Sequence, residues 1–258
     1  MFDSLTQQAV EFYRENGFVQ INQVLSTKEL EEIRENIEEA MAMSSQRAFQ
    51  REKGSLYYRV LNQKVNTWRD SGAMAKFAFH AGFAEMARQL SGVEKLRFFH
   101  DHALLKMPGD SKETPWHQDL PYWPFHERRA LSIWIALDDV DETNGCLTFI
   151  PGSHKVGKLK GISLTKPEDI FKYVQNTGIK EQHPVRTPLK AGSCTFHNGL
   201  TFHYAHSNTT QRPRRAYAII YVPDGTVYTG KDHVVTDGTG LQAGQPLAGG
   251  LFPIVAGR

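Results

Sequence analysis

The sequence contains few cysteines and no long apolar run, and these two absences exclude several classes of protein. Cys146 and Cys194 are the only cysteines in 258 residues, too few for a disulfide framework or for a zinc site built from four cysteines. The most apolar stretch, ALSIWIAL at 130–137, is far shorter than the roughly 18 residues that a transmembrane helix needs. Asp3 and Glu11 fall within an amphipathic N-terminal pattern, so we expect no signal peptide, no membrane span and a cytoplasmic location.

An excess of charge of either sign is also missing. Lysine and arginine number 30, aspartate and glutamate 28, and the formal net charge is +2. A basic surface that would attract nucleic acid is therefore not indicated. Hydrophobic residues make up 40% of the chain and charged residues 22%, which is typical of a globular protein. We expect a single domain over residues 1–258 whose partner is a small molecule, with an oligomeric state that the sequence does not indicate.

The first 92 residues are predicted to form a mainly helical layer. Two capping boxes precede apolar residues at helical spacing, Ser4 with Gln7 and Ser26 with Glu29. Gly17 predicts the end of the first helix, and residues 18–21 a short strand. A further helical region is predicted over residues 73–90.

From residue 93 to residue 223 the pattern changes to short β-rich runs separated by turn residues. The predicted strands are 96–106, 131–137, 146–150, 193–196 and 217–222. Such a series indicates an antiparallel sandwich or barrel. The connection at 155–184 is long enough for us to expect a lid. Residues 224–258 are rich in glycine and are expected to be irregular.

The sequence His117-Gln118-Asp119 is a potential metal-binding motif. On an extended strand, residues two apart point to the same side, so His117 and Asp119 can offer a nitrogen and an oxygen to one ion. His203 lies 84 residues after Asp119 in the β-rich part and can supply the third ligand of a facial triad for non-haem Fe(II). In the alternative interpretation, which spacing alone favours, His117 bonds to nearby backbone and Asp119 caps a turn before Pro121.

Three longer segments give this motif a context. They are WHQDLPYWPF (116–125), NGCLTFIPGSH (144–154) and FHNGLTFHYAHSN followed by RPRRA (196–216). In this order the segments resemble the phytanoyl-CoA dioxygenase family of Fe(II)- and 2-oxoglutarate-dependent oxygenases, over residues 17–223. The resemblance implies a mostly β (α+β) fold, a double-stranded β-helix or cupin-like jelly roll with N-terminal helices packed on one sheet.

The resemblance also assigns roles to individual residues. His117, Asp119 and His203 correspond to the iron ligands, and Arg214 to the arginine that binds the distal carboxylate of 2-oxoglutarate. Arg214 follows His203 by eleven residues, and this spacing favours His203 over its neighbours His197 and His206 as the ligand. On a strand Arg212 and Arg214 would share a face while Arg215 points away.

Further residues are implied in cosubstrate binding by their positions. Trp134 matches a family position that contacts the cosubstrate. Gln118 lies between two of the ligands, where its backbone or amide could also contact the cosubstrate, and Lys64 is a third candidate. The alternatives are core packing for Trp134 and an exposed surface for Lys64. Tyr204 and Ala205 stand where the family commonly has small residues, often with serine second. This difference predicts the loss of one cosubstrate hydrogen bond and a narrower pocket.

The implied activity is hydroxylation of an unactivated C–H bond with Fe(II) as the cofactor. The reaction would consume 2-oxoglutarate and O2 and release succinate and CO2. The substrate would be a small organic molecule: an acyl-CoA, a metabolite or a natural product. Two alternatives stay open, a cupin-like Zn(II) or Mn(II) hydrolase or isomerase and a non-catalytic jelly-roll binding protein. Neither alternative needs Arg214 as a carboxylate clamp.

Overall fold

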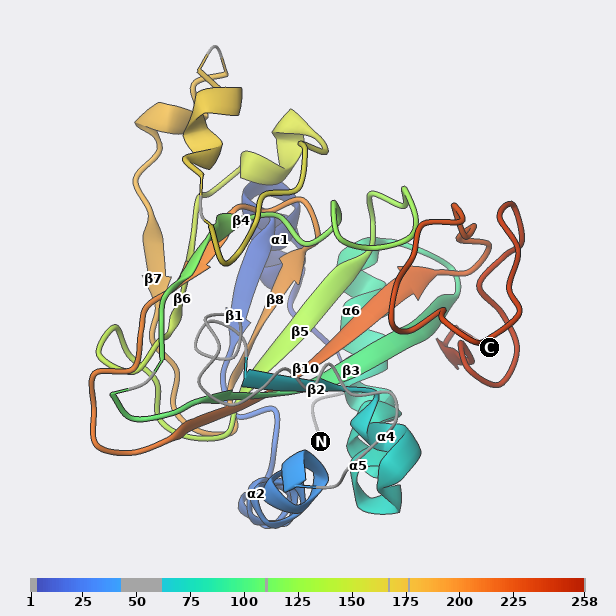
Figure 1. The fold of residues 1–258 in the computed structure, drawn as a ribbon, viewed down its shortest axis with the longest axis horizontal. Helices are drawn as coiled ribbons and strands as arrows, with labels where there is room; N and C mark the ends of the chain where they lie inside the picture. Colours follow the sequence, from blue (N-terminus) through green and yellow to red (C-terminus); the bar gives the residue numbers. More distant parts are fainter. Residues whose placement is uncertain (1–3, 43–61, 110, 167, 176, 258) are drawn as a thin grey trace.

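The computed structural model describes residues 4–42, 62–109, 111–166, 168–175 and 177–257 of the chain. Two antiparallel sheets face each other (Figure 1), one of seven strands in the order β1-β8-β5-β10-β3-β11 with β2 on β3, the other of four in the order β4-β9-β6-β7. The larger sheet contains β1 (Phe18–Ile21), β2 (Asn62–Val65), β3 (Leu96–Lys106), β5 (Leu131–Ala136), β8 (Cys194–Asn198), β10 (Arg214–Pro223) and β11 (Ile254–Ala256). The smaller sheet contains β4 (Thr114–His117), β6 (Leu147–Phe149), β7 (Val185–Thr187) and β9 (His203–Ala205). The predicted jelly roll is confirmed.

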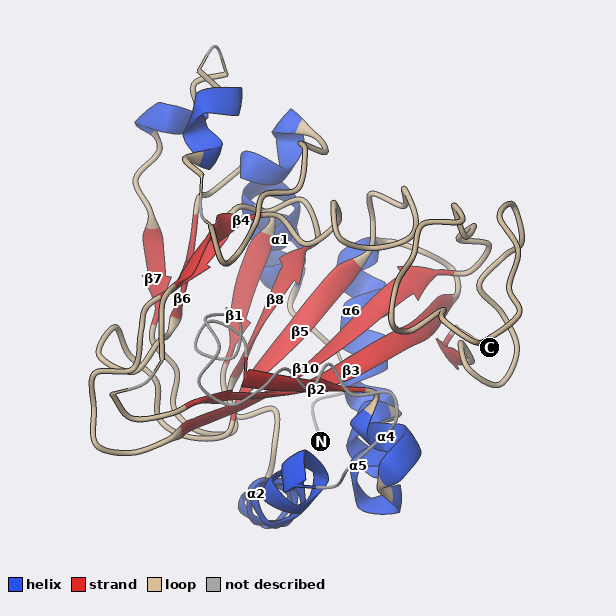
Figure 2. Cartoon of the chain, viewed as in Figure 1, coloured by secondary structure: helices blue, strands red, loops and turns tan. Residues whose placement is uncertain are grey.

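The helices cover the outer face of the larger sheet (Figure 2). They are α1 (Gln7–Asn16), α2 (Thr27–Ala42), α4 (Thr67–Asp70), α5 (Gly72–Ala78) and α6 (Ala81–Ser91). Apolar side chains of the sheet, such as Ile133 and Phe196, form one core with helical residues such as Ile33, Phe77 and Phe83. Burial of this apolar area stabilises the sheet from behind, and the packing of the N-terminal helices on one sheet is as predicted.

Helix boundaries follow the capping signals with one correction. The Ser26–Glu29 capping box is present: the Ser26 amide donates to Glu29 Oε2 (2.9 Å) and the Glu29 amide donates to Ser26 Oγ (3.3 Å). The first helix, however, is capped by Thr6, not Ser4, because Thr6 is extended and its side chain accepts a hydrogen bond from the Ala9 amide (3.2 Å). Gly17 ends this helix in the left-handed region at φ 82°, as predicted.

The strands of the larger sheet align their inward-facing side chains in rows. Alternation along each strand puts every second residue on the inner face. The register gives a first row of His100, Ile220, Ser132 and His197, and a second row of His102, Ala218, Trp134 and Thr195. Each row crosses β3, β10, β5 and β8 in that order. These rows form one wall of the space between the sheets.

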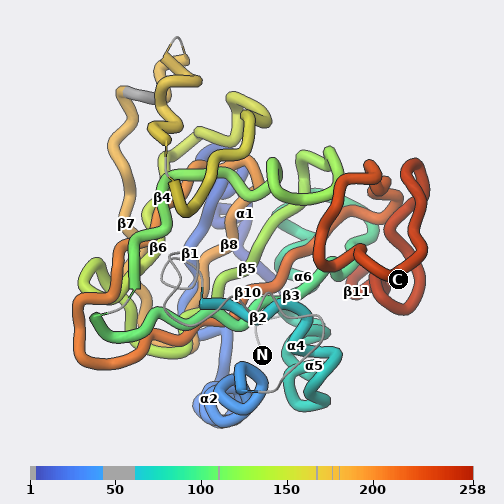
Figure 3. Tube along the Cα trace, in the orientation of Figure 1, coloured from blue at the N-terminus to red at the C-terminus, as the bar shows by residue number. Residues whose placement is uncertain are grey.

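Two segments extend from this framework. The first runs from η1 (Ser153–Val156) through the 3₁₀ turns η2 (Ile170–Tyr173) and η3 (Ile179–Glu181) to β7, and it projects beyond the smaller sheet (Figure 2); its movement as a lid stays a prediction. The second, after β10, loops beside the ends of β3 and β10 (Figure 3). This segment was expected to be irregular throughout, but it ends in β11, because Ile254–Ala256 pairs with the free edge of β3. Among the described residues, no helix combines the length and apolar character of a membrane span.

A buried carboxylate joins α4 to the larger sheet. Asp101 Oδ2 accepts hydrogen bonds from the Tyr217 hydroxyl (2.8 Å), the Trp68 amide (3.3 Å) and the Thr67 hydroxyl. Burial raises the pKa of Asp101 to about 6, although these hydrogen bonds act to lower it. Tyr221, four residues further along β10, has a buried hydroxyl with no partner among the described residues.

The two tyrosines provide a matched pair for a stability measurement. We expect Tyr217→Phe to lower the free energy of unfolding by about 1–3 kcal/mol, since Asp101 loses a donor in a buried site. Tyr221→Phe removes an unpaired hydroxyl and is expected to leave the free energy unchanged or to raise it. Urea denaturation of the two variants measures both values, and equal losses would show that the Asp101 network does not stabilise the fold.

Candidate active site

Three potential metal ligands meet at the edge of the smaller sheet. His117 ends β4, His203 begins β9, and these two residues are paired in the register of the two strands. Asp119 follows two residues after the end of β4, and its Oδ1 lies 3.6 Å from Nε2 of each histidine. The ligand atoms all lie within 4.8 Å of one another. The structure therefore brings together the three residues that the motif singled out.

Backbone carbonyls orient both histidines. His117 Nδ1 donates to the Pro115 carbonyl (2.8 Å) and His203 Nδ1 donates to the Thr201 carbonyl (3.0 Å). Each bond fixes the tautomer whose Nε2 lone pair faces Asp119. The local backbone bond that the alternative interpretation gave to His117 does exist, and it leaves the other nitrogen available as a ligand.

The second oxygen of Asp119 is held by the larger sheet. Oδ2 accepts hydrogen bonds from Ser132 Oγ (3.3 Å) and His197 Nε2 (3.2 Å), so Oδ1 is left facing the two ligand histidines. Sequence analysis assigned no role to Ser132 and considered His197 only as an alternative to His203, because only the register shows that the two residues are neighbours in the row beside Asp119.

The protonation states suit a divalent cation. Burial alone would raise the pKa of Asp119, but His203, His117 and His197 hold that pKa well below its usual value. Burial and repulsion by His117 lower the pKa of His203 to about 3. A carboxylate and a neutral imidazole are the forms that bind metal. Two nitrogens and one oxygen on one side of a site, with the other side open to a cavity, fit Fe(II).

A cavity of about 450 Å³ extends from the triad along the inner face of the larger sheet, and Trp134 and Arg214 line it. Arg214 is 3% exposed, and its guanidinium carbon lies 5.2 Å from the centre of the Trp134 ring. Its Nε donates to the Asn144 carbonyl (3.4 Å), while Nη1 is buried without a hydrogen-bond partner among the described residues. Burial lowers the pKa of Arg214 to about 10, so the group stays charged. A buried, charged guanidinium with an N–H group free in this way fits a carboxylate.

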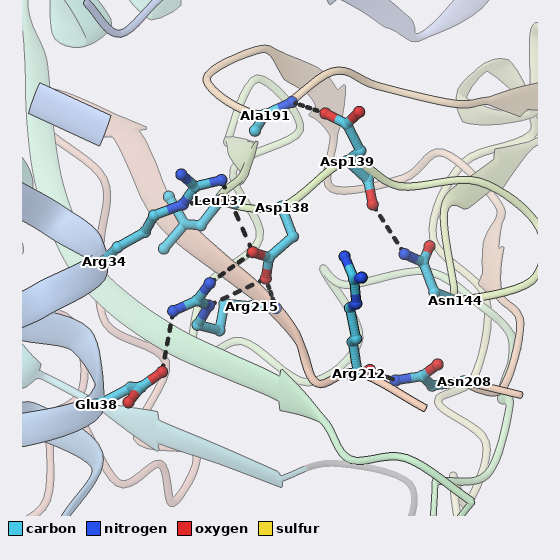
Figure 4. Close-up of polar contacts among 10 residues, drawn as sticks. All are labelled: Arg34, Glu38, Leu137, Asp138, Asp139, Asn144, Ala191, Asn208, Arg212 and Arg215. Carbon is cyan, nitrogen blue, oxygen red and sulfur yellow. Dashed lines mark hydrogen bonds and ion pairs between the residues drawn. The ribbon is translucent and has the colours of Figure 1, made fainter. Parts of the chain in front are cut away.

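The neighbouring arginines point elsewhere (Figure 4). Arg215 turns to the opposite face, where it pairs with Asp138 (2.7 Å) and Glu38 (2.9 Å). Arg212 lies before β10 begins and is exposed. The alternation predicted for Arg215 is confirmed, and Arg214 lines the cavity whereas Arg212 and Arg215 do not.

A second basic residue, Lys106, lies opposite Arg214 in the register of β3 and β10 and also lines the cavity. It is 4% exposed, and its Nζ donates to the Lys112 carbonyl (2.7 Å). Burial and the charge of Arg214 lower the pKa of Lys106 to about 6. Sequence reasoning missed this residue because a lysine at the end of a predicted strand is expected to be exposed.

Two predicted cosubstrate residues are not brought to the cavity. Gln118 Nε2 donates to the carbonyls of Gly157 and Leu200, and its Oε1 accepts from the Leu159 amide, all at 2.8 Å. The Gln118 side chain therefore holds Gly157 and Leu159, at the start of the 155–184 segment, by hydrogen bonds. Lys64 is neither at the cosubstrate pocket nor exposed: Nζ donates to the Ala40 carbonyl (2.7 Å) and pairs with Asp70 (2.9 Å), which ties β2 to α2 and α4.

Tyr204 does not narrow the pocket, contrary to expectation. Strand alternation turns it outward, where its hydroxyl donates to Glu113 (2.6 Å), while Ala205 lines the cavity. Tyr122 and Trp123 contribute to the cavity wall, and Leu164 reaches it from the 155–184 segment.

Comparison with known proteins agrees with this geometry. The family described as phytanoyl-CoA dioxygenase (PhyH) matches residues 13–216. The chain belongs to the phytanoyl-CoA dioxygenase family. It is 25% identical over 234 residues to the peroxisomal phytanoyl-CoA dioxygenase of Rattus norvegicus, covering 84% of this chain and 68% of that protein. This family consists of Fe/2-oxoglutarate-dependent oxygenases with a His-x-Asp…His triad.

Solved structures extend the similarity over nearly the whole chain. The α-ketoglutarate-dependent epimerase SnoN of nogalamycin biosynthesis is 30% identical with a TM-score of 0.80, and 97% of this chain and 98% of that chain are covered. The carbocyclase SnoK of the same biosynthesis is 28% identical with a TM-score of 0.85 over 98% and 97%. A further SnoN structure contains Fe3+, α-ketoglutarate and nogalamycin RO.

The hydrogen bond from His197 to Asp119 predicts that His197 contributes to the metal affinity of this phytanoyl-CoA dioxygenase family member. We expect His197→Phe to weaken Fe(II) binding by about ten- to a hundredfold, the usual effect of losing a group that orients a ligand. The control is Thr195→Val, two residues earlier on the same face of β8, whose hydroxyl has no partner among the described residues. Anaerobic metal titrations compare the two, and an unchanged affinity in His197→Phe would remove His197 from the site.

Proposed function

We propose that this protein hydroxylates a C–H bond of a small organic substrate, consuming 2-oxoglutarate and O2. One oxygen atom enters the substrate as a hydroxyl group and the other enters succinate, while the first carboxylate of 2-oxoglutarate leaves as CO2. The observation that carries this proposal is the presence of two features in one cavity: the cluster of His117, Asp119 and His203, and the buried guanidinium of Arg214, whose Nη1 has no partner among the described residues.

The distance between the metal ligands and Arg214 suits a short dicarboxylate. Asp119 is held over the first row by Ser132 and His197, and the Arg214 guanidinium lies on Trp134 in the second row. Successive rows are two residues apart along a strand, or about 7 Å. A molecule with one end at the metal ligands and a carboxylate at Arg214 would bridge this distance.

The chain's own residues bind and orient the reactants. Fe(II), when bound with 2-oxoglutarate, supplies the activation of O2. Arg214 provides positive charge for the distal carboxylate, and the Lys106 amine lies beside it as a further hydrogen-bond donor. Trp134, Leu147 and Ala205 line the cavity with apolar surface, which keeps water from the bound anion and strengthens its attraction to the guanidinium.

The likeness to SnoN and SnoK favours a second candidate, an oxidation that ends in epimerisation or ring closure instead of hydroxylation. All three outcomes begin with removal of hydrogen from a carbon beside the metal. They differ in the product: hydroxylation adds one oxygen atom and ring closure removes two hydrogen atoms. Epimerisation leaves the mass unchanged and requires an external two-electron reductant in addition to 2-oxoglutarate and O2. The hydrolase and isomerase alternatives require no buried carboxylate clamp, so Arg214 argues against them.

Cosubstrate binding is tested on two adjacent arginines. We expect Arg214→Ala to raise the 2-oxoglutarate concentration for half-maximal succinate formation by about ten- to a hundredfold, since charge-assisted hydrogen bonds are lost. Arg215→Ala, which breaks an ion pair on the opposite face, is expected to leave this concentration unchanged. Succinate is measured in reactions with Fe(II), and an equal effect of both variants would refute the clamp.

The outcome of the reaction is tested by mass spectrometry under ¹⁸O2. Hydroxylation predicts a product that carries one ¹⁸O atom, formed together with succinate. A product of unchanged mass, or one lacking two hydrogen atoms, would replace hydroxylation by the second candidate. Absence of 2-oxoglutarate-dependent succinate formation would overturn both.

A further inference from the structure

Two basic side chains face each other at one end of the cavity. Lys106 on β3 and Arg214 on β10 are partners in the register of the two strands. Side chains directly opposite on neighbouring strands have Cβ atoms about 4.5–5.5 Å apart. Both residues line the cavity, and they are 4% and 3% exposed. These two residues are called the basic pair below.

Lys106 is enclosed by groups that carry no charge. Its Nζ donates to the backbone carbonyl of Lys112 (2.7 Å). A Cβ placed on Gly145 would lie 2.9 Å from Cδ of the lysine, so the backbone there packs against the lysine stem. The Asn208 side chain donates to the Lys106 carbonyl (2.9 Å), and Asn62 is the neighbouring described position on β2. None of these contacts neutralises an ammonium group.

The acidic groups nearest to the basic pair are engaged elsewhere. Glu113 acts on Lys106 and Asp138 acts on Arg214, in each case through charge alone and without a hydrogen bond. Glu113 is exposed and accepts from the Tyr204 hydroxyl (2.6 Å), and Asp138 pairs with Arg215 on the opposite face of the sheet (2.7 Å). Within the described part of the chain, the basic pair therefore has no carboxylate of its own.

Two buried bases side by side do not both stay charged at neutral pH. Like charges away from water disfavour the charged form of the weaker base, and lysine gives up its proton far more readily than arginine. Burial and the charge of Arg214 lower the pKa of Lys106 to about 6, whereas burial lowers that of Arg214 only to about 10. At neutral pH Lys106 is therefore mostly a neutral amine beside a charged guanidinium.

A carboxylate at Arg214 would reverse this balance. Its negative charge offsets that of the guanidinium, and an opposite charge nearby favours the charged form of a base. A protonated Lys106 would then donate a charge-assisted hydrogen bond to the same carboxylate. Both carboxylates of 2-oxoglutarate are already ionised at neutral pH, so the proton has to come from the solvent.

We propose that Lys106 is a second binding residue for the distal carboxylate of 2-oxoglutarate and that its amine takes up a proton from solvent when this carboxylate binds. Succinate keeps the distal carboxylate, so the proton returns to solvent when succinate leaves. Cosubstrate affinity is then highest at low pH, where Lys106 is already charged, and it falls as the pH rises toward the pKa of the lysine in the complex. This inference rests on the proposed function, because it takes this end of the cavity as the cosubstrate site.

Calorimetry measures the proton uptake directly. 2-Oxoglutarate is titrated anaerobically into the full chain loaded with Fe(II), in buffers that differ in their heat of ionisation. At about pH 7 we expect an uptake of about 0.7–1 proton, and we expect the Kd to rise about tenfold between about pH 6.5 and pH 8.

The matched ligand is 2-oxopentanoate, which has the same chain length and the same 2-oxo acid group but no distal carboxylate. It is expected to bind without proton uptake, because it brings no charge to the basic pair. No uptake with 2-oxoglutarate, or equal uptake with both ligands, would overturn the proposal.

Variants then assign the proton to Lys106. Lys106→Met keeps the length of the side chain and cannot bind a proton. It is expected to show no uptake, a Kd that does not change with pH, and binding at about pH 6.5 that is about tenfold weaker than in the wild type. Lys112→Met, at an exposed side chain whose backbone carbonyl is unchanged, is the control and is expected to keep the full uptake. Full uptake in Lys106→Met would refute the role of Lys106.

The calorimetric result is distinguishable from a failure of the proposed function. Binding of 2-oxoglutarate without proton uptake would refute the role of Lys106 and leave the oxygenase in place. No binding of 2-oxoglutarate to the Fe(II)-loaded chain would refute both. Uptake that depends on Lys106 in a protein that forms no succinate would support the carboxylate site and refute the proposed function.

Discussion

The carboxylate of Asp119 is the point at which the two sheets are held in register with each other. One oxygen accepts from Ser132 and His197 of the larger sheet, and the other faces His117 and His203 of the smaller sheet. A buried carboxylate is stable only when such partners surround it. The same contacts fix which oxygen is free for a metal, so one group links the two sheets and presents an oxygen to the metal site.

The cavity beside Asp119 is divided by charge. Arg214 and Lys106 face each other where β10 begins and β3 ends, and the histidines His100 and His102, whose pKa values burial holds low, lie in the middle of β3. A buried guanidinium attracts an anion strongly in a low dielectric. The end of the cavity at Arg214 is therefore suited to a carboxylate.

Features that depend on short stretches of the sequence were predicted correctly. Motif spacing and family resemblance led to the triad and Arg214, and alternation correctly separated Arg214 from Arg215. The misplaced residues depend on long-range structure: β2 was not predicted, and its pairing with β3 turns Lys64 toward Asp70. The roles of His197 and Lys106 come from register between strands that are distant in sequence, which no local pattern contains.

The central claim is that His117, Asp119 and His203 bind Fe(II) together with 2-oxoglutarate. Anaerobic titration of the metal-free protein with both reactants, followed by visible absorption, tests this claim most directly. The account predicts a metal-to-ligand charge-transfer band in the wild type and its loss in Asp119→Ala. No band in the wild type, or an undiminished band in Asp119→Ala, would contradict the account.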